Sequence, residues 1–136
     1  MRVAIVHFLK NRSRTEQSIL ENLREASVQR GNDVTIIDGY EDGSGTPLVL
    51  FDYLAVLIRT DGLFSAHVPD AVMRRLRGAG TLSGKKGCAL VIRGGLRSGK
   101  LCRNLMADLE TAGLRLDYFD SIRDAAHASA VGTNVG

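Results

Sequence analysis

Tryptophan is absent from this chain of 136 residues, and proline and cysteine occur only twice each. Two cysteines are too few for a disulfide-stapled miniprotein, and scarce proline excludes a collagen-like chain. No apolar run approaches the roughly 20 residues that a membrane span needs. The first such run, Val3 to Val6, is also too short for the core of a signal peptide. We therefore expect a cytoplasmic protein, without a membrane span, in which Cys88 and Cys102 are buried, reduced thiols.

The remaining composition is that of an ordinary globular protein. Hydrophobic residues make up 44% of the chain and charged residues 24%. The length suits one domain with a single sheet. Lysine and arginine number 18 against 15 acidic residues, so the net charge is 18 − 15 = +3. This mild excess excludes neither acidic small ligands nor nucleic acid, so the placement of the charges must be considered.

Short apolar runs rich in β-branched residues alternate with segments of helical periodicity. Continuous apolar runs are typical of strands that are covered on both faces in a parallel sheet. The alternation predicts a three-layer α/β fold with a five-stranded parallel sheet of order 2-1-3-4-5. The expected strands are 3–8, 34–37, 53–58, 88–92 and 114–119. The expected helices begin near Ser13, Pro69 and Leu101, and a single helical turn is expected at 48–51.

The start of the first helix has a sequence signature of its own. Ser13 and Glu16 have the S-x-x-E spacing of a capping box, in which each side chain accepts a hydrogen bond from the other residue's backbone. Gly31 is suited to the other end of the helix, because glycine tolerates the left-handed conformation found there. The pattern therefore predicts a helix between these two positions.

The end of the chain contains small and polar residues. We expect residues 1–122 to form the domain and 123–136 to be a short helix or a loose tail. The last helix of such a fold is therefore short or missing, which would leave part of the sheet's apolar face exposed. Exposed apolar patches are usually covered by a partner, and we predict a homodimer.

Positive charges follow several of the predicted strands. The carboxyl ends of parallel strands lie at one edge of a sheet, where ligands bind. Helix N-termini at the same edge attract anions, so a cationic rim there suits a phosphate. The alternative interpretation is that these are solvated loop charges. The cations concerned are Lys10, Arg12, Arg14, Arg59, Arg93, Arg97, Lys100 and Arg103. A second group, Arg74, Arg75, Arg77, Lys85 and Lys86, is expected at the opposite edge and is interpreted as serving solubility or partner contact.

A glycine-rich segment lies between the fourth strand and the next helix. Gly94 to Lys100 matches the letters G-x-x-x-x-G-K of a nucleotide-binding P-loop. Leu101, however, occupies the Ser/Thr position that would bind magnesium. The segment is better interpreted as a glycine-rich ligand loop or a plain strand-to-helix turn. Asp61 and His67 share another loop of the same edge, but nothing in the sequence fixes them as an acid–base pair.

Three stretches resemble the flavodoxin family. The first strand runs into Leu9–Glu16, whose last two residues match the end of the family's phosphate-binding motif S-x-T-G-N-T-E. Residues 51–60 resemble the third strand and its exit, and 82–91 resemble the approach to the fourth strand. The resemblance covers about residues 2–120. It implies a flavodoxin-like fold that binds flavin mononucleotide (FMN) for electron transfer or a small flavin-dependent redox reaction.

The resemblance also implies which residues hold the cofactor. Ser13, Thr15 and the cations around them would bind the phosphate, and Phe64 is the aromatic side chain available to lie against the flavin ring. A redox partner protein or a small-molecule acceptor is implied as well. The implied cofactor-binding residues are Lys10, Asn11, Arg12, Ser13, Arg14, Thr15, Thr60, Asp61, Gly62, Phe64, Gly94, Gly95 and Gly99.

The sequence departs from the family pattern in three ways. Its phosphate loop has no glycine and carries three cations, its ring loops lack the usual Trp or Tyr pair, and classical flavodoxins are acidic. A second function therefore stays open: a non-catalytic flavodoxin-like module that has lost flavin and binds another anion or a protein. Aromatic residues make up only 5%, and no nucleic-acid motif is present, which argues against nucleic acid.

Overall fold

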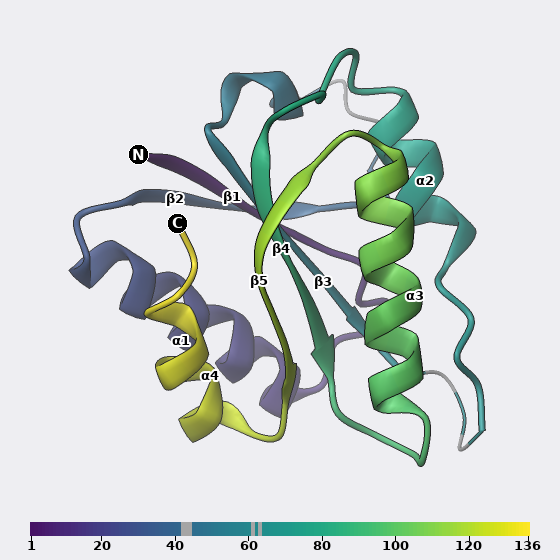
Figure 1. Cartoon of the computed structure of the whole chain (residues 1–136). Coiled ribbons are helices and arrows are strands. Elements are labelled where there is room, and N and C mark those ends of the chain that lie inside the picture. Colours follow the sequence, from purple (N-terminus) through teal and green to yellow (C-terminus); the bar gives the residue numbers. More distant parts are fainter. Residues whose placement is uncertain (42–44, 61, 63) are drawn as a thin grey trace.

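The computed structural model of the chain describes residues 1–41, 45–60, 62 and 64–136. A twisted sheet lies between two layers of helices (Figure 1). The strands are β1 (Arg2–His7), β2 (Asp33–Asp38), β3 (Tyr53–Arg59), β4 (Lys86–Ile92) and β5 (Arg115–Ile122). The helices are α1 (Arg14–Gln29), α2 (Asp70–Arg77), α3 (Ser98–Thr111) and α4 (Ala125–Gly132), with a 3-10 turn at Leu48–Leu50.

The sheet has five strands in the order β2-β1-β3-β4-β5, and all neighbouring strands are parallel. The predicted fold class and strand order are therefore confirmed. The three central strands are almost entirely buried, whereas β2 and β5 alternate between less and more exposed residues. This difference follows from position, because an edge strand has a neighbour on one side only.

Two apolar cores lie on opposite faces of the sheet. Helices α2 and α3 cover one face, with Val72, Leu76 and Leu105 packed on β3 and β4. Helices α1 and α4 cover the other, with Leu23 and Val131 in the same cluster. Both free cysteines are buried, Cys102 in the first core and Cys88 in the second, as predicted.

The C-terminal segment forms a short helix that packs on α1. Ala128 and Val131 of α4 are buried, and so is Val135 beyond it. The Ser27 hydroxyl on α1 donates to the Val135 carbonyl at 2.7 Å. Of the two predicted alternatives, the short helix is therefore confirmed and the loose tail is wrong. The segment covers part of the sheet face that was expected to be exposed, and the homodimer stays a prediction.

Helix α3 begins earlier than the sequence suggested. Its first residue is Ser98, so Gly99 lies in the first helical turn and not in the preceding loop. The Ser98 hydroxyl donates to the Gly94 carbonyl at 3.0 Å and accepts from the Gly94 amide at 3.3 Å. This bonding pattern closes the glycine-rich segment into a compact strand-to-helix turn.

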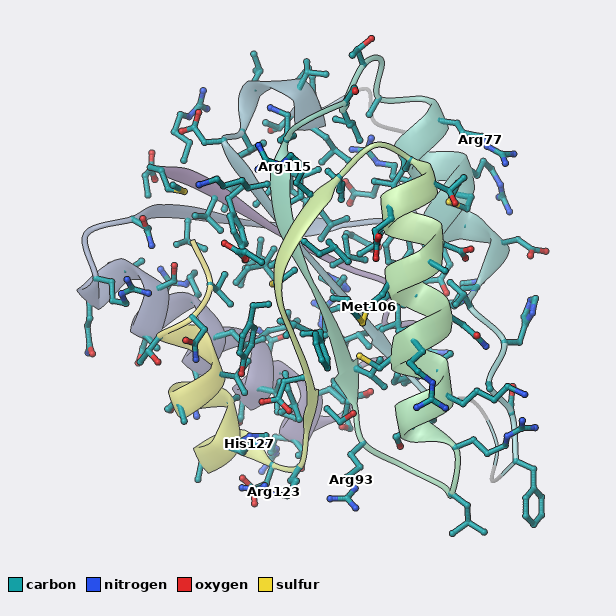
Figure 2. All side chains as sticks on the ribbon, viewed as in Figure 1. Arg77, Arg93, Met106, Arg115, Arg123 and His127 are labelled. Atoms are coloured by element: carbon teal, nitrogen blue, oxygen red, sulfur yellow. The ribbon has the colours of Figure 1, made fainter. Side chains whose placement is uncertain are left out.

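The two ends of the strands differ in their surroundings. Arg93, directly after β4, lies at the carboxyl edge, while Arg77 and Arg115 lie at the opposite edge (Figure 2).

No helix in the described part of the chain is long and apolar enough to cross a membrane. Among the same residues, no group of three or more potential metal-binding side chains converges.

Candidate anion and cofactor site at the carboxyl edge of the sheet

The loop after β1 leads directly into a capped helix. The Ser13 hydroxyl accepts from the Glu16 amide at 3.1 Å, and the Glu16 carboxylate accepts from the Ser13 amide at 2.9 Å. The predicted capping box is therefore present. Asn11 adopts a left-handed φ of 52°, which lets the loop turn sharply without a glycine. The first amides of α1, those of Arg14 and Thr15, have no acceptor within the helix and point out of its end.

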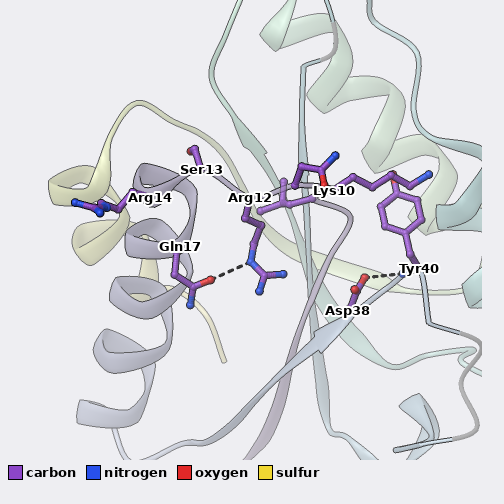
Figure 3. Close-up of a pocket in the computed structure, with 9 residues that line it drawn as sticks. Lys10, Arg12, Ser13, Arg14, Gln17, Asp38 and Tyr40 are labelled. Atoms are coloured by element: carbon purple, nitrogen blue, oxygen red, sulfur yellow. Dashed lines mark hydrogen bonds between the residues drawn. The ribbon is translucent and has the colours of Figure 1, made fainter.

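An open pocket of about 770 Å³ lies beside this loop. Five of the predicted site residues line it together, Lys10 to Arg14. Leu9, Gln17, Asp38 and Tyr40 also line it, and they were not predicted (Figure 3). The pocket therefore opens toward β2, whose following turn supplies Tyr40. The sequence offered only one signal for this side of the pocket. Polar residues, Asp38 and Tyr40, stand on either side of Gly39 at the end of β2.

A partly buried ion pair connects the third strand to the loop. The Arg59 guanidinium donates to both carboxylate oxygens of Glu16, at 2.9 and 3.0 Å. It also donates to the Lys10 carbonyl at 2.6 Å. Burial alone would raise the pKa of Glu16, but hydrogen bonds from Ser13 and Arg59 outweigh it and lower that pKa. Arg59 thus holds the loop in place from the end of β3.

His7 lies under the same loop and is buried. Its Nε2 lies 3.1 Å from Nη1 of Arg12, whose Nε donates to Gln17 Oε1 at 2.9 Å. Burial, followed by the Arg12 charge, lowers the pKa of His7, although Asp38 acts in the opposite direction. A neutral ring can accept the Arg12 hydrogen bond at its Nε2.

The loops after β3 and β4 approach each other closely. A Cβ atom at Gly94 would lie only 2.8 Å from Oγ1 of Thr60, so only glycine fits without a shift. Two predicted site residues from different loops are therefore neighbours. Gly62 and Gly95 have φ values of 82° and 69°, which the absence of a side chain makes accessible.

Two apolar side chains project from these loops into solvent. Phe64 is 65% exposed and Leu96 is 75% exposed. The Arg97 guanidinium donates to the Phe64 carbonyl at 3.4 Å, and Asn104 on α3 donates to the Ala66 carbonyl at 2.8 Å. The β3 loop is thus attached to α3, and the exposed side chains belong to segments that these bonds connect.

Comparison with known proteins gives a consistent result at the level of structure. No family model matches the chain, and no curated protein matches it. Oxidised flavodoxin 1 from Bacillus cereus superposes with a TM-score of 0.70 at 14% identity, over 97% of this chain and 95% of that one. The fold is that of a flavodoxin.

Two further solved structures extend this comparison. The NAD(P)H:quinone oxidoreductase of Methanothermobacter marburgensis matches with a TM-score of 0.66 at 16% identity, over 98% of both chains. A Fusobacterium nucleatum flavodoxin mutant bound to flavin mononucleotide matches with a TM-score of 0.59 at 14% identity, over 85% of this chain and 66% of that one. At these low sequence identities, the likeness shows the fold of this chain alone.

The structure distributes the predicted site residues over three neighbouring places. Residues 10–14 line the pocket beside α1, and Thr15 is exposed in the helix's first turn. Thr60 and Gly94 are in close approach, and Phe64 and Gly95 lie in the same pair of loops. Gly99 is displaced from them into α3. Asp61 lies outside the described residues.

The predicted cationic rim is partly neutralised from within the flavodoxin-like chain. Arg59 is paired with Glu16, Arg12 is bonded to His7 and Gln17, and Lys10 Nζ lies 4.5 Å from the centroid of the Tyr40 ring. Some of these charges therefore shape the loop instead of standing ready for a ligand. Sequence spacing places charges at an edge, but it does not show which partners they meet.

Proposed function

We propose that this flavodoxin-like protein binds FMN at the carboxyl edge of its sheet and serves in electron transfer or a small flavin-dependent redox reaction. The observation that carries the proposal is the meeting of three loops at one edge. One leads into the capped start of α1, and the other two carry exposed apolar side chains. A bound flavin would supply the redox chemistry, and the chain would hold and orient it.

The first loop suits a phosphate group. The amides of Arg14 and Thr15 point out of the helix end, where the helix dipole favours negative charge. The Ser13 hydroxyl accepts from Glu16, so its hydrogen is available to donate to a phosphate oxygen. The Arg59–Glu16 pair keeps this segment in one conformation before a ligand arrives, which reduces the ordering cost of binding.

The second and third loops suit a flat aromatic ring. Phe64 and Leu96 are large apolar side chains with little cover from the protein, and burying them against a ligand is favourable. The close approach of Gly94 to Thr60 keeps the two loops adjacent. A flavin ring held here would belong to the same FMN molecule whose phosphate the first loop binds.

The test is a flavin titration of the purified protein, followed by visible absorbance and flavin fluorescence. We expect FMN to bind with quenched fluorescence, and riboflavin to bind at least tenfold more weakly because it lacks the phosphate. Phe64→Ala should weaken FMN binding several-fold. Phe119→Ala is the matched control, because Phe119 is also 58% exposed but lies on β5 outside these loops.

Absence of binding at high micromolar FMN would reject the proposal. It would favour the second function, a flavodoxin-like module that binds another anion or a protein. The specific observation behind that alternative is the internal pairing of Arg12 and Arg59, which leaves fewer charges for a phosphate. Equal affinity for riboflavin and FMN would reject the assignment of the phosphate to the α1 loop.

A further inference from the structure

A buried arginine without a partner lies away from the three loops. Arg75 is on α2, and only 9% of its surface is exposed. Its Nε is buried and forms no hydrogen bond. No described residue forms an ion pair or hydrogen bond with its guanidinium. From the sequence, Arg75 was expected to serve solubility or partner contact at the surface, and its burial on α2 contradicts the role in solubility.

Arg75 borders a cavity of about 320 Å³ between α2 and the turn after β2. Ala71, Arg75 and Gly78 follow each other at helical spacing, so one face of α2 forms a wall. The turn after β2 forms the facing wall, and Arg74 adds a second, exposed guanidinium. The described residues that line it are Gly39, Tyr40, Glu41, Ala71, Arg74, Arg75 and Gly78.

A buried N–H without a hydrogen-bond partner is costly, and arginine cannot avoid the cost by losing its proton. Nearly all buried polar groups in native proteins have a partner, so an orphaned one calls for an explanation. The guanidinium fork matches a carboxylate or phosphate by two parallel hydrogen bonds. A cavity beside such a fork is therefore suited to an oxyanion.

The other lining residues narrow the class of ligand. Among the described lining residues, Arg74 and Arg75 contribute two positive charges and Glu41 one negative charge, so these three side chains carry 2 − 1 = +1. A monoanion would balance this charge, whereas a phosphate monoester near pH 7 carries close to two negative charges. The Tyr40 ring and the Ala71 methyl group offer apolar contact to the rest of the ligand.

We propose that this cavity binds a small organic molecule through one oxyanion group, a carboxylate in preference to a phosphate, held by the Arg75 guanidinium. The site is separate from the proposed flavin site, because α2 and not α1 supplies its cation. Tyr40 lines both pockets and stands between them.

The test is thermal unfolding of the full chain with benzoate or phenyl phosphate as probes at matched ionic strength. A ligand that binds only the native state raises Tm as its concentration exceeds Kd. We expect benzoate to raise Tm by several degrees and phenyl phosphate to raise it less. Arg75→Met should abolish both shifts, and Arg75→Lys should retain part of them.

Arg77→Met is the matched control, because Arg77 lies on the same helix but lines a different pocket at the outer edge (Figure 2). It should leave the benzoate shift unchanged. Arg75→Met without ligand should fold with equal or higher stability, since it removes a buried N–H that has no hydrogen-bond partner. Far-ultraviolet circular dichroism verifies that this variant is folded before its ligand response is compared.

Three outcomes would overturn the proposal. Neither probe changes Tm, the shift survives Arg75→Met, or Arg77→Met abolishes it as well.

The Glu41→Gln variant tests whether a ligand or Glu41 itself pairs with Arg75. If Glu41→Gln is much less stable than the wild type, and the probes do not change the Tm of the wild type, then Glu41 itself pairs with Arg75 in solution. No ligand is then needed. A larger shift with phenyl phosphate would keep the oxyanion site and reject its preference for a carboxylate.

Discussion

His7 is the residue whose ionisation is most closely connected with the candidate site. Its ring is buried under the β1 loop and faces Arg12, and burial followed by this charge lowers its pKa. The native state therefore binds fewer protons at this ring than the unfolded chain does at mildly acidic pH. Under the linkage relation, its contribution to stability is complete above the unfolded pKa of about 6.5 and is lost as pH falls further.

We expect wild-type stability to fall as pH is lowered from 7 to 5, partly through His7. His7→Gln should make this dependence shallower, because the ring that must stay neutral is gone. The measurement is the urea midpoint at several pH values. His67→Gln is the control, since the His67 side chain is 74% exposed. An equal change of slope in both variants would contradict the assignment to His7.

Ser13 stabilises the start of α1 through two reciprocal hydrogen bonds. Ser13→Ala removes the acceptor for the Glu16 amide, and loss of such a cap costs about 1 kcal/mol. We expect a decrease of about that size in the free energy of unfolding, measured by urea denaturation. Ser129→Ala, at an exposed position of α4, should change it by less than about 0.5 kcal/mol.

For contacts between individual residues, the sequence allowed only those between near neighbours in the chain to be predicted. Ser13 and Glu16 are three positions apart and their capping box was predicted, because helix geometry alone brings them together. Arg59 meets the same carboxylate from 43 positions away. Nothing in the residue types specified that pairing, and it depends on β3 lying beside β1.

Among the elements, α4 is held by an unusually close approach to α1. A Cβ atom at Gly132 would lie 2.7 Å from Cβ of Ala26 and 2.8 Å from the Leu23 carbonyl oxygen. The two helices can therefore pack at this distance only while position 132 has no side chain. The close contact explains how an eight-residue helix with mostly small side chains covers one end of the sheet face.

Gly132→Val should push α4 away from α1 and lower the free energy of unfolding by about 1–3 kcal/mol, as overpacking commonly does. The measurement is chemical denaturation. Gly45→Ala serves as the control, because a Cβ there would meet nothing within 4 Å. A neutral Gly132→Val variant would show that the contact between the two helices is not tight in solution.

The strands were easier to predict than the last helix. β3 and β4 are continuous apolar runs, and their burial on both faces follows directly from that pattern. α4 contains alanine, serine and glycine without a strong apolar stripe, so its amphipathic signal is weak. Its position depends on close backbone packing, which hydrophobic periodicity does not report.

Over the whole molecule, the two cores enclose both thiols. Burial raises the pKa of Cys88 to about 12 and that of Cys102 to about 11. Thiolate is the reactive form, so we expect neither cysteine to react with a disulfide reagent in the native protein at pH 8. Both should react once urea unfolds the chain. Rapid reaction of one thiol without denaturant would contradict this picture of the cores.

The arrangement of the molecule was predictable, but its charge balance was not. Alternating strands and helices determined the sheet order and thereby the edge at which loops meet. Whether a cation at that edge is paired depends on contacts such as those of Arg12 and Arg59. Arg75 on α2 shows the converse: it was predicted at the surface, but it is buried and its Nε has no hydrogen-bond partner. Its neighbours in the sequence gave no sign of this burial.

Asn32 contacts both ends of the chain. Its Oδ1 accepts from the Met1 nitrogen at 3.2 Å, and its Nδ2 donates to the Val135 carbonyl at 3.3 Å. The ends therefore lie close together (Figure 1). A short glycine-rich linker could join them, and new termini could be opened at Gly84, an exposed turn before β4. The flavodoxin-like domain is thus suited to circular permutation, and a permutant opened there would leave the carboxyl-edge loops intact.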